Sequence, residues 1–235
     1  NGGNNPDPTY YKNLPSYFIN NYFPTYDPYT VPVANPLYAQ AEIAKQDFLN
    51  NGQIDWPRMY HANSVNKKSI YALYEDRVDD DLITFTSVLD SQISENILMN
   101  ASVSYKNLKS ENYQLMLDLL GDYTFLDTDS FYIGYGFTPS QSQSDLRNPN
   151  RQVGVGDKYG YNYVLRAETL DAFTQFKFTF SKVDFYLAQS FSKTQYQREG
   201  LYQNGLYANN SYGKGQKLDF EDFGFKGGIT YKING

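Results

Sequence analysis

Apolar and polar residues alternate along residues 97–106, and this pattern indicates a β-strand with one apolar face. The odd positions from Ile97 to Tyr105 are apolar, whereas the even positions from Asn100 onward are polar. The same two-residue period occurs in residues 68–93 and 159–181, and in the last segment of the chain. These patterns predict an all-β protein with long antiparallel strands.

The first two strands predict a hairpin whose register can be derived from the turn "SEN" at residues 94–96. A three-residue turn places Thr86 opposite Ser104 and Asp90 opposite Asn100, so that one face is polar. The opposite face is then apolar.

A second hairpin is predicted where "SKVD" at residues 181–184 joins two further strands. This turn would place Phe180 opposite Phe185 and Phe178 opposite Leu187 on one apolar face.

The loops differ in length in a regular way. The apolar faces lie beside the short turns, and each strand becomes polar toward a long connection, as in "YEDRVDDD" and "KNLKSEN". We expect all short turns at one end of the sheet and all long loops at the other. Two stretches inside the long loops, residues 39–51 and 112–122, predict short helices.

This arrangement is typical of an outer-membrane β-barrel, which has short periplasmic turns and long extracellular loops. About 9–11 residues of each strand would cross the lipid. Alternation is also expected of a soluble antiparallel sandwich, which remains an open alternative. The predicted lipid-facing residues are Ile83, Phe85, Leu89, Ile97, Met99, Val103, Phe176, Phe178, Phe180, Phe185, Leu187 and Ile229.

Composition and charge exclude several kinds of partner and site. Aromatic residues make up 17% of the chain, with 24 Tyr and 16 Phe, so large rings supply much of the apolar surface. The formal net charge of -6 is a poor match for nucleic acid, and we expect no nucleic-acid partner. The absence of cysteine excludes disulfides and thiolate metal sites.

Several segments resemble the barrel region of Bacteroidetes TonB-dependent outer-membrane receptors, the family that includes the SusC-like transporters. The similar segments are "NPDPTYYKNLPSYF", "IDWPRMYHAN", "DLRNPNRQVGVGDKYGYNY", "REGLYQNGLYANNSYGKGQKLDF" and "FGFKGGITYKING". The resemblance implies a barrel of about 22 strands, of which this chain would supply about five to seven. It also implies a location in the cell outer membrane and import of a glycan, peptide or metal chelate.

The same resemblance implies partners: outer-membrane lipid, the TonB complex and a surface lipoprotein. We expect the plug domain, the TonB box and the remaining strands to lie outside residues 1–235. The chain would then be one partial barrel domain. Its expected parts are an extracellular loop region (1–67), a hairpin (68–107), an extracellular loop (108–158), a hairpin (159–200), a loop (201–213) and a strand (214–235).

Aromatic, Arg and Asn residues in the long loops are the candidate ligand contacts, because such side chains grip sugars and peptides. Packing of the loops against one another is the alternative role for the same side chains. The candidates are Tyr10, Tyr11, Trp56, Arg58, Tyr60, Asn148, Arg151 and Asp157.

The segment "GDYTFLDTDS" has carboxylates at a spacing that suits calcium, with Asp122, Asp127 and Asp129 as ligands. It lacks the glycine and distal glutamate of an EF-hand, so a solvated acidic loop is the alternative. No other cofactor is expected.

We expect no enzymatic activity, because His61 is the only histidine and no nucleophile-elbow motif surrounds any serine. Two other functions stay open. One is a barrel that does not transport and acts as an adhesin or assembly component; the other is a soluble carbohydrate-binding β domain.

Overall fold

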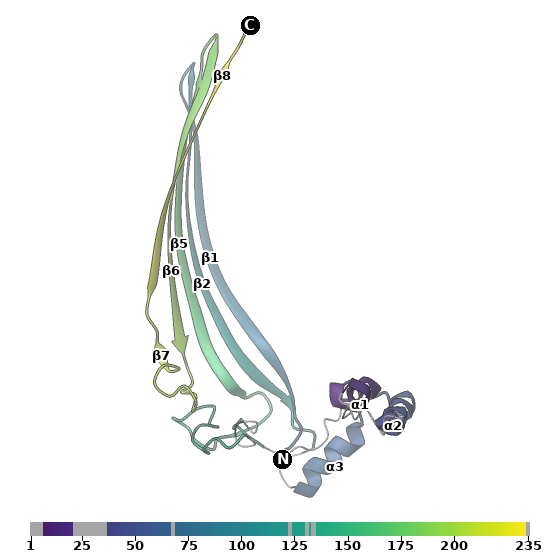
Figure 1. Cartoon of the computed structure of the whole chain (residues 1–235). Helices are drawn as coiled ribbons and strands as arrows, with labels where there is room; N and C mark the ends of the chain where they lie inside the picture. The colour runs from purple at the N-terminus through teal and green to yellow at the C-terminus, as the bar shows by residue number, and fades with distance from the viewer. Residues whose placement is uncertain are drawn as a thin grey trace, which may run out of the picture. The chain divides into compact units, whose positions relative to one another are not determined.

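The computed structural model describes residues 7–20, 37–66, 69–121, 124–129, 132 and 135–233 (Figure 1). The chain divides into two compact units. The first comprises residues 1–73 and 118–125, and the second comprises residues 74–117 and 126–235.

The second unit is built from a long antiparallel sheet. Its strands follow the order β1-β2-β5-β6, and both β7 and β8 pair with β6. A separate small sheet pairs β3 with β4. The strands are β1 (Leu73–Ser94), β2 (Ile97–Asp118), β3 (Phe125–Leu126), β4 (Gln152–Val153), β5 (Lys158–Thr179), β6 (Val183–Gly200), β7 (Gly213–Lys214) and β8 (Leu218–Tyr231).

The first unit holds short helices. They are η1 (Tyr11–Asn13), α1 (Pro15–Asn20), α2 (Leu37–Asn50) and α3 (Trp56–Asn66). Among the described residues, no helix is long and apolar enough to cross a membrane.

The predicted all-β class is confirmed, since the strands form a mainly antiparallel structure with few helices. The predicted helix at residues 39–51 is also confirmed, as α2. Within the sheet, the short β1–β2 and β5–β6 turns and the end of β8 lie at one end, as Figure 1 shows. We call this the turn end. The long connections after β2 and β6 leave from the other end, which we call the loop end.

The predicted helix at residues 112–122 is wrong, because β2 continues through this stretch to Asp118. Its backbone pairs with the start of β5, where Asn112 lies opposite Tyr163 and Gln114 opposite Tyr159. Helix propensities amount to a few tenths of a kcal/mol per residue, so a continuous ladder overrides them. The first hairpin is therefore longer than residues 68–107.

The predicted register of the second hairpin is also wrong, by two residues. Phe178 lies opposite Phe185, and Phe176 lies opposite Leu187. The chain reverses earlier than expected, and the Phe180 amide donates to the Val183 carbonyl at 3.0 Å. A two-residue shift preserves the side of the sheet on which each residue lies, so the predicted faces are unchanged.

Helix α3 was not predicted, although its start carries clear signals. The carboxylate of Asp55 accepts a hydrogen bond from the Arg58 amide at 3.0 Å, which caps the first turn. Pro57 lies in that turn, where its missing N–H costs no helical hydrogen bond.

Candidate functional site

One face of the long sheet carries no charged residue over a stretch beside the turn end. The register places Ile97, Phe178, Phe185 and Ile229 in one row across four strands. The side-chain hydrogen bond between Thr86 and Ser104 (3.0 Å) and the one between Asp90 and Asn100 put the odd positions of β1 on this face too. Both contacts follow the predicted register of the first hairpin.

We call this stretch the uncharged band. It comprises Phe85, Ser87, Leu89, Ser91 and Ile93 of β1; Ile97, Met99, Ala101, Val103 and Tyr105 of β2; Leu170, Ala172, Thr174, Phe176 and Phe178 of β5; Phe185, Leu187, Gln189 and Phe191 of β6; and Phe223, Phe225, Gly227, Ile229 and Tyr231 of β8.

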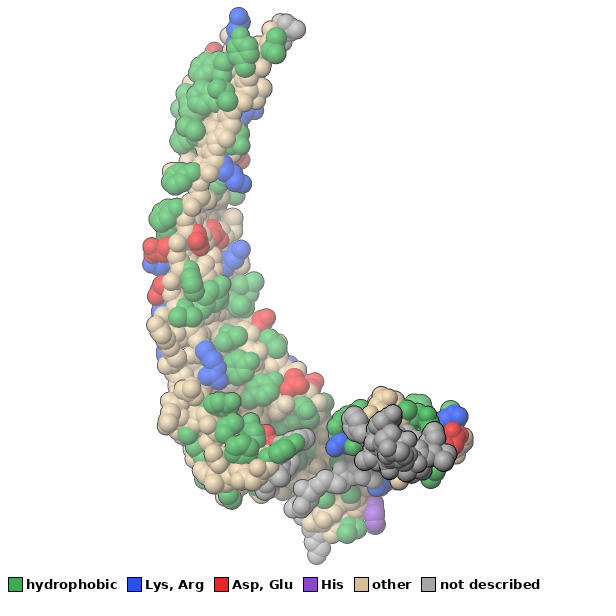
Figure 2. All heavy atoms as spheres, viewed as in Figure 1, with side chains coloured by type: hydrophobic (Ala, Val, Ile, Leu, Met, Phe, Trp, Pro, Cys, Tyr) green, Lys and Arg blue, Asp and Glu red, His purple; other side chains and the backbone are tan. Residues whose placement is uncertain are grey.

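Aromatic rings pack against one another within the band, but their outer surfaces are exposed. Phe178 stacks on Phe185 with ring centroids 4.4 Å apart, and Phe191 contacts Phe223 at 5.0 Å. Phe223 and Phe225 are nevertheless 69% and 77% exposed. Figure 2 shows hydrophobic side chains near the turn end of the sheet and also farther along toward the loop end.

Charged residues begin abruptly on the loop side of the band, on the same face. Lys193 pairs with Glu221 at 2.7 Å, and farther along Arg166 pairs with Glu199 at 3.0 Å. The band therefore has a defined edge.

The predicted lipid-facing residues share this face. Ten of the twelve belong to the band; Ile83 lies on β1 just beyond its loop-side edge, and Phe180 lies just past β5 with its ring centroid 6.3 Å from that of Phe185.

The opposite face is mostly polar in the same rows, although it includes Val88, Leu98 and Phe173. Ser192 donates to Asp171 at 2.7 Å, and Asp90 bonds to Asn100. A Cβ on Gly228 would lie 2.5 Å from the ring of Tyr186, so a larger residue there would require this ring to move.

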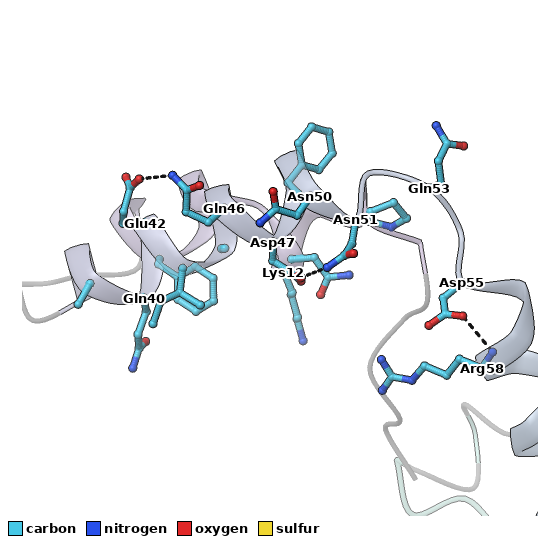
Figure 3. Close-up of a pocket in the computed structure, with 17 residues that line it drawn as sticks. Lys12, Gln40, Glu42, Gln46, Asp47, Asn50, Asn51, Gln53, Asp55 and Arg58 are labelled. Atoms are coloured by element: carbon cyan, nitrogen blue, oxygen red, sulfur yellow. Dashed lines mark hydrogen bonds between the residues drawn. The ribbon is translucent and has the colours of Figure 1, made fainter.

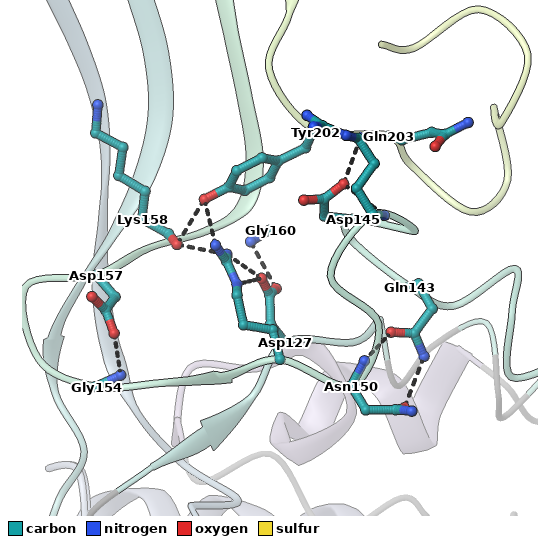
Figure 4. Close-up of polar contacts among 12 residues, drawn as sticks. Asp127, Gln143, Asp145, Asn150, Gly154, Asp157, Lys158, Gly160, Tyr202 and Gln203 are labelled. Carbon is teal, nitrogen blue, oxygen red and sulfur yellow. Dashed lines mark hydrogen bonds and ion pairs between the residues drawn. The ribbon is translucent and has the colours of Figure 1, made fainter.

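At the loop end, Arg151 joins the long loop between β2 and β5 to the loop after β6. Its guanidinium pairs with Asp127 and donates to the Tyr202 hydroxyl at 2.9 Å and to the Lys158 carbonyl at 2.7 Å. Tyr202 donates to the same carbonyl at 2.9 Å, and Asp127 also accepts from the Gly160 amide at 2.9 Å (Figure 4).

We call these contacts of Arg151 the first joint. Partial burial shifts the pKa values of its side chains. Burial opposes the charge on Arg151, yet its hydrogen bonds to Tyr202 and Asp127 leave its pKa raised. Burial raises the pKa of Tyr202, although Arg151 acts in the opposite direction. Nearby on β5, burial and a hydrogen bond to Asp76 raise the pKa of Tyr161 to about 12.

A second joint links the same two loops through Asp145 and Gln203. The Gln203 amide donates to the Asp145 carboxylate at 3.0 Å, and the Leu146 amide donates to the Gln203 carbonyl at 2.7 Å (Figure 4). The Gly205 amide bonds to the Gln143 carbonyl at 2.8 Å. A Cβ at Gly205 would lie 2.1 Å from the Ser140 carbonyl oxygen, so this close approach requires glycine.

The predicted ligand residues of this loop have different surroundings. Arg151 is occupied by the contacts just described, and Asp157 accepts a hydrogen bond from the Gly154 amide at 2.7 Å, which closes a turn. Asn148 is exposed.

The predicted calcium ligands do not come together among the described residues. Asp122 lies outside those residues, the Asp127 carboxylate is bonded to Arg151 and Gly160, and Asp129 is exposed. In the part of the chain that the structure describes, no three His, Cys, Asp or Glu side chains form a metal-binding group.

The remaining predicted ligand residues lie in the helical unit. Tyr10 and Tyr11 form a ring cluster with Tyr17, with centroid separations of 4.8 Å and 5.7 Å. Trp56, Arg58 and Tyr60 are exposed on α3.

An open pocket of the helical unit includes only Arg58 of these candidates. Polar side chains of α2 line much of it, together with Lys12 and Asp55 (Figure 3). The carboxylates along α2 are already bonded locally, Glu42 to Gln46 at 2.8 Å and Asp47 to Asn51 at 2.8 Å.

Asn63 is an important residue that the sequence did not reveal. It is fully buried, and its amide group donates to the carbonyls of Tyr71 (2.8 Å) and Leu119 (2.9 Å). Its side-chain oxygen accepts from the amides of Ile70 (2.8 Å) and Tyr71 (3.0 Å). Asn63 thus holds α3 on the segments that flank β1 and β2. Asparagine is common in this sequence, so its type alone gave no signal.

No family model matches the chain, and a search of curated proteins finds no significant match.

Proposed function

We propose that the long sheet is part of an outer-membrane β-barrel of a TonB-dependent receptor that imports a glycan, a peptide or a metal chelate. In this proposal lipid covers the uncharged band, the turn end faces the periplasm and the loop end faces the outside of the cell. The loops would contact the nutrient.

The observation that carries the proposal is the extent of the uncharged band. From Ile97 to Tyr105 it spans about nine residues of β2, close to the ~9–11 residues that a tilted strand needs to cross a bilayer. The ion pairs Lys193–Glu221 and Arg166–Glu199 begin where the band ends, as expected where strands leave the lipid.

The amount of exposed apolar surface supports a lipid cover over a water-exposed sheet. A Phe side chain has roughly 150–250 Å² of surface, so Phe223 and Phe225 together expose on the order of 200–350 Å². A typical soluble monomer has a largest apolar patch of about 300–600 Å². The other exposed residues of the band, such as Leu89, Leu187 and Ile229, add to this area.

The two edges of the sheet support a larger, closed structure. Among the described residues, β1 pairs with β2 on one side only, and β8 pairs with β6 on one side only. Long strands with unpaired edges promote aggregation, and closure into a barrel removes such edges. Further strands on both sides would pair these backbones.

The test uses single cysteines, because residues 1–235 contain none; any cysteine elsewhere in the full-length protein would first be replaced by serine. Cysteines placed in the full-length protein at 223, 224, 225 and 226 would be labelled with an environment-sensitive fluorophore, and the protein would be folded into phosphatidylcholine vesicles. We expect a blue shift at 223 and 225 but not at 224 and 226, because side chains alternate between faces. Emission typical of water at all four positions would contradict the membrane assignment.

A second measurement separates import from a purely structural barrel. Deletion of the full-length gene should abolish growth on the imported nutrient, and loss of TonB should have the same effect. Normal uptake in both strains would favour an adhesin or assembly component.

A further inference from the structure

Arg147, in the long loop between β2 and β5, differs from the neighbouring Arg151 in having an unoccupied guanidinium. Arg151, Arg77 and Arg166 all form ion pairs with carboxylates. Among the residues that the structure describes, the Arg147 side chain has neither a carboxylate partner nor a hydrogen bond, although the chain carries a net charge of -6. Its side chain is exposed.

The guanidinium is held in place although it is unpaired. Its central carbon lies 4.2 Å from the ring centroid of Tyr212, so the ring covers one of its faces. Stacking leaves the N–H groups at the edge of the guanidinium free to donate.

The backbones on both sides of this stack are anchored. The Arg147 amide donates to the Asp145 carboxylate at 3.2 Å, and that carboxylate also accepts from the Gln203 amide at 3.0 Å. Beside Tyr212, the buried Ser211 accepts from the Asn204 amide at 2.9 Å through its hydroxyl. Arg147 and Tyr212 therefore approach each other on a joined pair of loops.

We propose that Arg147, stacked on Tyr212, recognises a carboxylate group of the ligand. A guanidinium presents two parallel N–H donors that match the two oxygens of a carboxylate, and stacking reduces the entropy that binding must cost. The exposed amide of Asn148 lies next in the chain and adds a polar contact for a sugar or peptide. This inference rests on the proposed function. It narrows the imported ligand to one that carries a carboxylate, either a uronate sugar or an acidic peptide.

The experiment measures binding to the full-length protein in detergent by isothermal titration calorimetry. The probes are tri-galacturonate, tri-glutamate and a neutral galactose trimer. We expect Arg147→Gln to weaken binding of the acidic probe about tenfold or more, since charge-assisted hydrogen bonds are lost. Arg147→Lys should weaken it several-fold because lysine lacks the paired donors.

Two further variants separate recognition from general effects. Tyr212→Leu keeps the charge but removes the stacking, and should weaken binding about 2- to 5-fold. Lys182→Gln removes an exposed cation from the β5–β6 turn, at the turn end of the sheet, and serves as the control, with affinity unchanged. Circular dichroism of each variant should match that of the unmodified protein.

Binding of tri-galacturonate alone assigns the carboxylate to a sugar, binding of tri-glutamate alone assigns it to a peptide, and binding of both shows that the carboxylate suffices. The inference is overturned if neither acidic probe binds, if the neutral trimer binds as tightly, or if Arg147→Gln retains full affinity. The cysteine labelling described above reports on the membrane assignment independently, so the two ideas can fail separately.

Discussion

Replacing Phe225 with lysine tests whether lipid or water covers the uncharged band. Phe225 lies opposite Gln189, in the row that also contains Thr174 and Ala101, midway along the band. In a membrane this row would lie near the midplane, where a lysine on the lipid face costs about 2–4 kcal/mol. That cost corresponds to a roughly 30- to 700-fold change in the folding equilibrium constant.

In water the same substitution should have little effect. Full burial of a Phe side chain contributes about 1.5–3 kcal/mol, and Phe225 is 77% exposed, so its removal should cost less than about 1 kcal/mol. The loss of stability caused by Phe225→Lys should therefore be at least about 1–2 kcal/mol greater in lipid than in water.

The assay is urea unfolding of the full-length protein in phosphatidylcholine vesicles, followed by electrophoretic mobility of the folded form. Phe220→Lys is the matched control: it makes the same chemical change on β8, at a position that is 51% exposed on the opposite face, toward the loop end. It should change stability by no more than about 1 kcal/mol, since it loses only a ring contact to Tyr196 at 6.1 Å.

Equal, small effects of the two lysines would refute the reasoning, because they would mean that water reaches the band. Retention of the unmodified protein in buffer without detergent, as a folded monomer, would refute it independently.

Three further predictions concern residues outside the band. Asn63→Ala leaves buried peptide groups without partners, at about 1–3 kcal/mol each, so hydrogen exchange and proteolysis should increase in α3 first; unchanged protection there would contradict the role given to Asn63. Arg151→Met leaves the Asp127 carboxylate buried and unpaired, which should destabilise the loop end by about 3–5 kcal/mol in thermal unfolding, and adding Asp127→Asn should recover part of the loss. Burial raises the pKa of Tyr161 to about 12 in the folded protein, compared with about 10 in the unfolded chain. The free energy of unfolding should therefore fall as the pH rises from about 10 to 12, because the unfolded chain loses this proton first. Tyr161→Phe should flatten this pH dependence in chemical denaturation.

The strands of the sheet could be predicted because their side chains alternate with a two-residue period. Thr86 and Ser104 meet as the sequence register requires, and α2 lies where a short helix ending before Asn51-Gly52 was predicted. The faces of the second hairpin were also correct although its register was not, since the error was an even number of residues.

The end of β2 could not be predicted from local preferences. Met116 is completely buried, and Leu and Met favour helices when considered alone. Their strand conformation depends on pairing with residues more than forty positions away, such as Leu115 with Lys158, which no local window contains.

The contacts that join the two long loops could not be predicted from the sequence either. Arg151 and Arg147 are four residues apart in similar surroundings of Asn, Gln and Pro, yet one is paired with Asp127 and the other stacks on Tyr212. Tyr202 follows Arg151 by 51 residues, whereas Tyr212 follows Arg147 by 65, so no local window contains either contact. Arg151 was predicted as a ligand residue, whereas the proposed contact is now Arg147.

The contacts of Arg151 constrain how the sequence of the loop end can change. The Arg151 guanidinium donates to Tyr202 in one loop and to the Lys158 carbonyl at the end of the other. The Tyr202 hydroxyl donates to the same carbonyl, so replacing one loop alone would leave polar groups of the other without their hydrogen-bond partners. Chimeras that exchange these loops should fold stably only when residues 126–157 and 201–212 are exchanged together, and we expect natural substitutions in the two stretches to occur together.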